Sequence, residues 1–395
     1  MTAQLSAVSM GDAAAPPPQP TTPPLMVPAV EGYDVMGLSA GAMEDFLRRH
    51  EPDLVAAARA RLERELLGLA HSAPAPSAWQ LVPHFWRLRS LAWTDAIGYD
   101  LWTASRKISR RCAALPNGDY PALVEIMLAD AAFCAARGAH AATANCFLSW
   151  HMAAPLLSLL EAQRAQEEKD GAPVFVWNNL FCIRQVMAPG TTHDFNDIFE
   201  NTIRLFRRTL VVLAPWHAPT MLTRIWCLAE IYHTVRHGCR LDVALSAAQR
   251  PAFERALVED FDSITMALSK IDVRKAEGRP EDVPKIMAMV EAGVGCQKLN
   301  EIVLAQMRAW VADAGRAALA ALPAAERATS VLLNNVAMLL QEQGRLDEAR
   351  PLFEEYMAGC RAARGDTHPE TLTAISNLGL LLQGQGRLDE ARPLL

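Results

Sequence analysis

Short apolar runs alternate with helical periodicity in the middle of the chain. Each run is apolar along its whole length instead of alternating with polar residues, which is typical of strands covered on both faces of a parallel sheet. They predict parallel, neighbouring strands at 145–149, 174–178 and 209–214, and a weaker fourth strand at 241–245. Helices are expected between them at 156–166, 195–208 and 223–236.

The flanking regions follow a different pattern. Residues 1–35 are rich in proline, which predicts a disordered leader. Apolar residues recur at three- and four-residue steps over 39–69, predicting a helix that Ser39 can cap, and residues 39–140 as a whole form a predicted helical region. Helical patterns return at 252–271 and 281–322.

The C-terminal part contains an internal repeat. The nonapeptide GRLDEARPL occurs at 344–352 and again at 386–394, an offset of 42 residues, and the apolar stretch before each copy aligns at the same offset. Each unit is predicted to be a pair of antiparallel helices, because Gly344 and Gly386 supply the turn that ends the first helix. Helices are expected at 329–343, 346–361 and 371–384.

Residues 328–395 resemble tetratricopeptide repeats of the kinesin-light-chain type. The resemblance implies a helical solenoid whose concave face binds peptides, with Asn335 and Asn377 facing the groove; alternatively, these side chains only satisfy local backbone groups. The chain ends inside the second helix of the second unit, whereas solenoids need about three units. We therefore expect about one and a half repeats, as in a truncated chain, with an exposed stacking face that self-associates.

A second resemblance lies further upstream. The segment 209–231 carries Trp226, Cys227 and Glu230 after an apolar strand, and it resembles the strand–loop–helix of TIR (Toll/interleukin-1 receptor) domains. The resemblance covers residues 142–310, including a helical extension. In TIR domains that cleave NAD this glutamate is catalytic, which implies that Glu230 could stabilise an oxocarbenium-like transition state.

Other interpretations of this segment stay open. Glu230 could be a structural carboxylate that pairs with Arg224 or Arg236, and Cys227 could be a buried thiol. The wider region 142–310 also departs from the family pattern, since residues 149–152 read Ser-Trp-His-Met where related modules usually have Ser-His-Ala-Trp, and Asn179 stands where they often have Asp. If the sheet forms, Glu230 should lie near the loop after Ser149 and the loop after Phe181, because the loops after parallel strands converge on one edge.

His233 and His237 stand four residues apart on one predicted helix, a spacing that metal ligands can use. The sequence places no third ligand nearby and lacks the HExxH form. We therefore interpret them as surface histidines and predict no metal site.

Composition narrows the function classes. The net charge of −6 argues against a sequence-blind nucleic-acid binder, which needs a basic face. No apolar run reaches the roughly 18 residues that span a bilayer. The eight cysteines are scattered singly and the first residues do not resemble a secretion signal, so a cytoplasmic location is expected.

Taken together, the sequence predicts an α/β plus all-α chain: a TIR-like parallel-sheet module flanked by helices, followed by the start of a repeat solenoid. The expected function is a protein-interaction or signalling scaffold, in which the repeats bind a peptide or partner protein and the TIR-like module self-associates or relays. One alternative is an NAD hydrolase that uses Glu230, with NAD as substrate rather than cofactor. Another is a kinesin-light-chain-like cargo adaptor, although no heptad pattern for pairing with a motor chain is visible.

Overall fold

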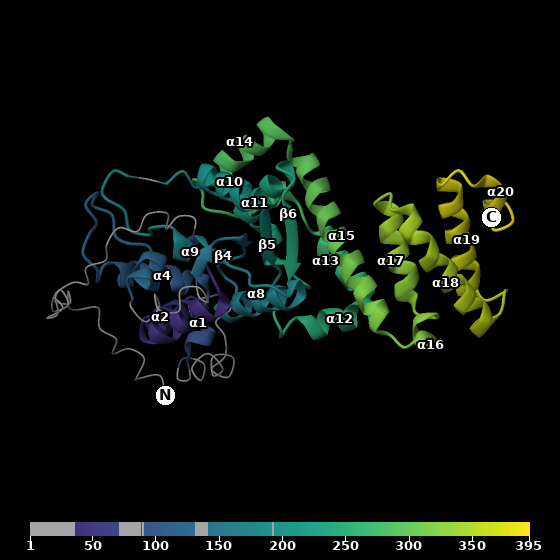
Figure 1. Ribbon diagram of the computed structural model, residues 1–395, viewed down its shortest axis with the longest axis horizontal. Helices are drawn as coiled ribbons and strands as arrows, with labels where there is room; N and C mark the ends of the chain where they lie inside the picture. Colours follow the sequence, from purple (N-terminus) through teal and green to yellow (C-terminus); the bar gives the residue numbers. More distant parts are fainter. Residues whose placement is uncertain (1–35, 71–87, 89–90, 131–140, 192) are drawn as a thin grey trace.

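The computed structural model describes residues 36–70, 88, 91–130, 141–191 and 193–395, which form an elongated body (Figure 1). A sheet and the N-terminal helices lie at one end and the C-terminal helices at the other, with the long helix α15 (Cys296–Ala321) between them. The predicted leader, residues 1–35, lies outside the described residues. Among the described helices, none is both long enough and apolar enough to span a lipid bilayer.

Four strands form the parallel part of the sheet: β3 (Cys146–Ser149), β4 (Val176–Trp177), β5 (Arg208–Val212) and β6 (Arg240–Ala244). Their spatial order is β4-β3-β5-β6, and each neighbouring pair is parallel. This confirms the predicted strands, with ends shifted by no more than two residues. The connection after β3 leads to β4 on one side of it, and the chain then crosses to β5 on the other side. In doubly wound sheets, ligands usually bind at this switch point between β3 and β5.

Helices connect the parallel strands and cover the sheet. They are α8 (Leu156–Asp170), the short α9 (Asn179–Cys182), α10 (Phe195–Phe206), the 3-10 helix η3 (Thr220–Thr223) and α11 (Ile225–Arg236). Side chains of β5 alternate between two apolar cores, with Leu210 and Val212 in one and Val211 in the other. Burial on both faces explains why this strand appears in the sequence as a continuous apolar run.

Two further strands make the sheet mixed, which the sequence did not predict. β1 (Met36–Leu38) pairs in antiparallel fashion with both β2 (Ala141–Thr143) and β4. A side chain at Gly37 could not be accommodated, because its Cβ would lie 2.6 Å from the carbonyl oxygen of Phe175. The amide of Gln163 on α8 donates to the carbonyl of Leu38 and fixes β1 from one side of the sheet.

The N-terminal helices pack onto this sheet: α1 (Ala40–Arg49), α2 (Glu51–Ala70), α4 (Gly98–Ser109), α5 (Leu123–Ala129) and the 3-10 helix η2 (Trp93–Asp95). Ser39 caps α1 as predicted, accepting a bond from the Ala42 amide. The single helix predicted over 39–69 is wrong, since the helix breaks at His50. Pro52 explains the break, because its ring clashes with the carbonyl four residues earlier and it has no N–H to donate. Apolar residues of these helices and of β3 and β4 form one shared core.

Between the sheet and the C-terminal helices lie α12 (Arg250–Glu259), α13 (Phe261–Ser269), the 3-10 helix η4 (Val273–Lys275), α14 (Val283–Gly293) and α15. The pattern over 252–271 divides at Asp260, whose side chain accepts the Ser263 amide and caps α13. α15 packs on α11 on one side and on α17 on the other, and a Cβ on its Gly315 would lie 2.4 Å from Val336. One apolar core therefore runs from the sheet into the C-terminal helices.

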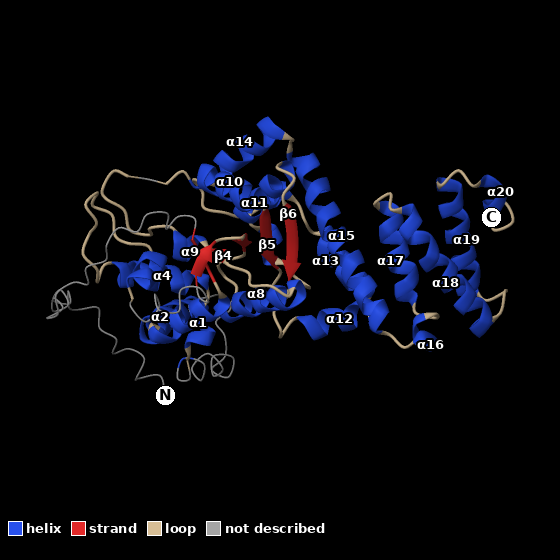
Figure 2. Ribbon diagram, viewed as in Figure 1, coloured by secondary structure: helices blue, strands red, loops and turns tan. Residues whose placement is uncertain are grey.

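The C-terminal helices confirm the predicted repeat. They are α16 (Ala324–Arg327), α17 (Val331–Glu342), α18 (Leu346–Arg364), α19 (Pro369–Gly384) and α20 (Leu388–Ala391). Gly344 and Gly386 adopt φ values of 74° and 75°, as the predicted turns require. The two copies also repeat one ion pair, Arg345 with Glu348 and Arg387 with Glu390. Figure 2 shows the described strands on the other side of the long helix α15 from these repeats.

Candidate functional site

The carboxyl end of β3 meets the helix that follows β5. Ser149 is the last residue of β3, and its hydroxyl donates to Glu230 Oε2 on α11 over 2.5 Å. Both side chains are buried. The predicted proximity of Glu230 to the loop after Ser149 is therefore confirmed, and the pair lies at the switch point of the sheet. The expected contact with the loop after Phe181 stays a prediction.

Burial changes the acid–base chemistry of Glu230. Desolvation raises the pKa of its carboxyl to about 8, and the bond from Ser149 only partly offsets this. The side chain is therefore largely neutral at pH 7. Its partner is a hydroxyl rather than the arginines that the structural interpretation suggested, and Arg236 instead lies 3.8 Å from Glu200.

Trp226 and Cys227, which carry the TIR resemblance together with Glu230, occupy different environments. Cys227 is buried with its sulfur 3.5 Å from the Trp150 carbonyl, and burial keeps its pKa well above the usual thiol value, as for an inert core thiol. Trp226 is partly buried, and its indole N–H donates to Asp282 over 2.9 Å. The ring of Phe199 on α10 packs edge-on against Trp226, with centroids 5.4 Å apart.

Trp226 also lines a cavity of about 400 Å³ between α10, α11 and α14, large enough for a small ligand. Its lining combines aromatic and charged side chains: His193, Asp194, Phe195, Asn196, Asp282, Lys285, Ile286 and Met289. Trp226 therefore borders an open cavity, whereas Glu230 is buried and is not among the described residues that line that cavity.

His233 and His237 do not lie on the surface as interpreted from the sequence. His233 is only 1% exposed and the His237 side chain is 22% exposed, because α10 packs across this face of α11. Burial lowers the pKa of His233 to about 4, although the charge of Glu200 opposes the shift. The third polar group, Glu200 on α10, was missed because it lies 33 residues upstream and only helix packing brings it to the histidines.

The repeats present a separate candidate surface on the solvent-exposed side of their first helices. Asn335 and the exposed Met338 lie on α17, and the half-buried Asn377 and exposed Leu380 occupy the equivalent positions on α19. The amide of Asn377 donates to Asn334 Oδ1 over 2.7 Å, joining the two helices. This surface, defined by Val331, Asn335, Met338, Asn377 and Leu380, is called the helix-A face below.

The segment that carries the helix-A face matches a known family. Residues 327–395 match the tetratricopeptide repeat family. The match confirms the tetratricopeptide repeats (TPRs) expected over 328–395, and TPRs are protein-interaction modules. No curated protein matches the chain.

The two candidate sites differ in how visible they are in the sequence. The TPR surface could be located because identical segments recur along one stretch of chain. At the sheet, the Ser149–Glu230 pair could be inferred from the rule that loops after parallel strands converge. Asp282 and Lys285 of the cavity had no such signal, since they lie at the start of α14 and just before it, well beyond the last strand.

Proposed function

We propose that this chain is a signalling scaffold in which the helix-A face of its TPRs binds a peptide segment of a partner protein. The observation that carries the proposal is the pairing of exposed apolar side chains with amides. Val331, Met338 and Leu380 are each more than two-fifths exposed, beside the amides of Asn335 and Asn377. Exposed apolar side chains can pack against apolar side chains of a peptide, and asparagine amides can form hydrogen bonds with the peptide backbone.

The two asparagines are not equivalent in this proposal. Asn377 already donates to Asn334, so it has a structural role between α17 and α19. Asn335 is not part of that pair and lies half-buried one turn before Met338. Asn335 is therefore the amide we expect to contact the peptide directly.

Selection from a displayed library of random peptides tests the proposal. Peptides that bind the full chain should lose at least tenfold in affinity to the variants Asn335→Ala and Met338→Ser. The matched control is Met266→Ser, which removes another exposed methionine on α13, away from the repeats. Peptides that bind all three variants equally well would refute the helix-A face as the binding surface.

The role proposed for the sheet-containing part is self-association or relay, in keeping with its TIR-like resemblance. The doubly wound strand order and the position of Glu230 on the helix after the third parallel strand support this resemblance. Sedimentation velocity over a wide concentration range tests it. An unchanged sedimentation coefficient with and without a selected peptide would argue against both self-association and relay.

NAD hydrolysis is the second candidate, and the Ser149–Glu230 pair at the switch point is the observation that favours it. Glu230 would have to lose its proton before it could stabilise a cationic transition state. Incubation with NAD should then release nicotinamide, and Glu230→Gln should abolish the release while Glu291→Gln does not. Absence of nicotinamide release from the wild-type chain would leave the scaffold as the only candidate function.

A kinesin-light-chain-like cargo adaptor is a narrower form of the scaffold proposal, in which the selected peptides would resemble cargo proteins.

A further inference from the structure

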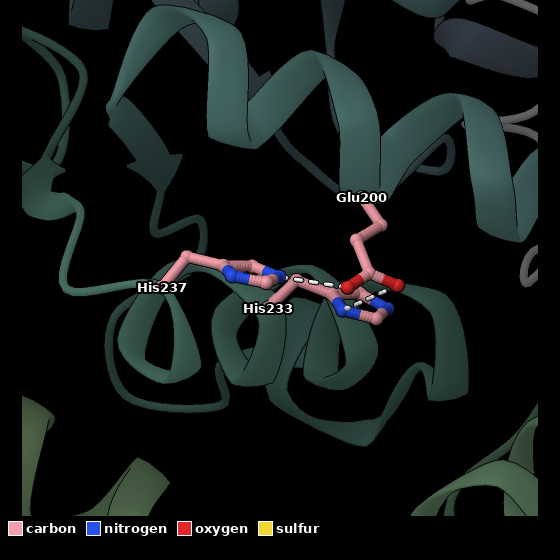
Figure 3. A group of neighbouring side chains, drawn as sticks. All are labelled: Glu200, His233 and His237. Atoms are coloured by element: carbon pink, nitrogen blue, oxygen red, sulfur yellow. Dashed lines mark hydrogen bonds and ion pairs between the residues drawn. The ribbon is translucent and has the colours of Figure 1, made fainter.

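Three potential metal ligands converge where α10 crosses α11 (Figure 3). Glu200 extends from α10 toward the rings of His233 and His237, which lie one helical turn apart on α11. Glu200 Oε1 is 2.7 Å from His237 Nε2, and Glu200 Oε2 is 3.6 Å from His233 Nδ1. One ligand atom from each residue lies within 4.8 Å of those from the other two.

The hydrogen bonding of His233 indicates which of its two ring nitrogens carries the proton and which has a free lone pair. Its Nε2 lies 3.2 Å from Asn196 Oδ1, and an amide oxygen can only accept, so Nε2 carries the proton. In the neutral ring, Nδ1 is then unprotonated. This nitrogen is buried without a hydrogen-bond partner and is aimed at the Glu200 carboxylate.

A lone pair aimed at a carboxylate is unfavourable unless a cation lies between them. A proton on Nδ1 would supply that cation, but it would require a charged imidazolium in a side chain that is 1% exposed. A metal ion supplies the charge without this cost, because it coordinates the neutral ring. A histidine that donates one N–H to an oxygen while offering the other nitrogen is also the usual arrangement of metal-bound imidazole.

We propose that Glu200, His233 and His237 bind a divalent transition-metal ion of the Zn²⁺ class. Two imidazole nitrogens and one carboxylate oxygen suit Zn²⁺, whereas Mg²⁺ and Ca²⁺ prefer oxygen ligands alone. Zn²⁺ bonds of about 2.0–2.2 Å place tetrahedral ligand atoms roughly 3.3–3.6 Å apart. The present separations run from 2.7 Å to at most 4.8 Å, so shifts of about 1 Å in the side chains would bring the ligand atoms to those distances.

The fourth position of such an ion would open toward solvent. His237 borders a cavity of about 410 Å³ whose lining includes Arg204, Arg207 and Cys239, so water can reach the ion from that side. The arginines oppose a cation here, as does Arg236 at 3.8 Å from Glu200. Arg236 is half-exposed, so water screens its charge and its side chain can turn away.

Titration of the metal-free full chain with Zn²⁺ or Co²⁺ tests the proposal. We expect one ion per chain, visible absorption bands of tetrahedral Co²⁺, and a rise in melting temperature with added Zn²⁺. Glu200→Gln and His237→Ala should each weaken Zn²⁺ binding at least tenfold. Both residues are partly exposed, so these variants should fold, which circular dichroism checks.

The matched control is His217→Ala, which removes an exposed histidine of the loop after β5 and should leave Zn²⁺ affinity unchanged. Absence of stoichiometric Zn²⁺ binding would overturn the proposal and identify the three residues as a hydrogen-bonded polar cluster. Binding that His237→Ala and Glu200→Gln leave intact would also overturn it, since the ion would then lie elsewhere. Neither result depends on peptide binding or on NAD cleavage.

Discussion

The sheet-containing part and the TPRs bury different kinds of side chain. Between residues 36 and 295 the core encloses charged and titratable groups, among them Asp100, Glu125, Glu230, His233 and Asp242. Among the described residues of 327–395, the buried polar side chains are Asn334 and Thr371, and none is a carboxylate, imidazole or cation. Buried charge seldom stabilises a fold, and perturbed groups cluster at functional sites, so chemistry is to be sought in the first part and surface recognition in the second.

The largest effect should come from breaking a buried ion pair in the sheet-containing part. Arg184 donates to both oxygens of the fully buried Glu125, over 2.9 and 2.8 Å. The variant Arg184→Met would leave that carboxylate without its counter-charge and should lower the free energy of unfolding by about 3–5 kcal/mol. Urea denaturation measures the change. A loss below about 1 kcal/mol would show that buried charge is not what distinguishes this part.

A second effect concerns the pH dependence of stability. The folded pKa of Glu230 is about 8 against a usual 4.5, so its neutral form favours folding, and stability is lost as pH rises through the folded value. The expected loss is about 1.4 kcal/mol per pH unit between roughly pH 5 and 8. Glu230→Gln keeps a neutral side chain and should flatten that part of the curve of unfolding free energy against pH. Ser149→Ala, the control, should retain a slope, and identical slopes in wild type and Glu230→Gln would contradict the assignment.

A third prediction addresses the junction of the two parts. A side chain at Gly315 would collide with Val336, so Gly315→Val should destabilise the contact of α15 with α17 by about 1–3 kcal/mol. The TPRs should then melt before the sheet, which calorimetry resolves as an additional transition. Gly41→Val is the control, because a Cβ on Gly41 would lie 3.9 Å from Ser39 Oγ, an ordinary contact distance. A single unshifted transition in Gly315→Val would mean that the two parts do not depend on this contact.

The smallest effect should come from the ion pairs of the repeats. Arg345 donates to Glu348, but both side chains are at least 30% exposed, so water already solvates them. Arg345→Met should change the free energy of unfolding by about 0–1 kcal/mol. Measured by the same urea denaturation as Arg184→Met, a loss as large as that of the buried pair would remove the contrast between the two parts.

The elements that could be predicted from sequence are those whose pattern is local. The parallel strands were visible because burial on both faces removes polar residues, and the repeats were visible because they recur. β1 and β2 are three residues each and have no alternation of their own, so their place depends on pairing with partners far along the chain. The break at His50 was foreseeable from Pro52 and was missed because the apolar stripe continues across it.

At the candidate sites the same distinction holds. The Ser149–Glu230 contact follows from sheet topology and could be anticipated. The position of Glu200 beside His233 depends on how α10 crosses α11, and no sequence spacing encodes a crossing angle between two helices. For Asn377, its bond to Asn334 depends on the exact stacking of α17 and α19.

Helix α15 also determines where the repeats could be cut out and grafted onto another protein. The family boundary at residue 327 would separate α17 from the helix that covers its Leu332 and Val336, both fully buried. A graft that begins at residue 327 would expose the apolar face of α17 to solvent and should aggregate. A graft that begins at Cys296 would bring its own cover, provided that the side of α15 that faces α11 is made polar. The transferable module is therefore one long helix larger than the repeat itself.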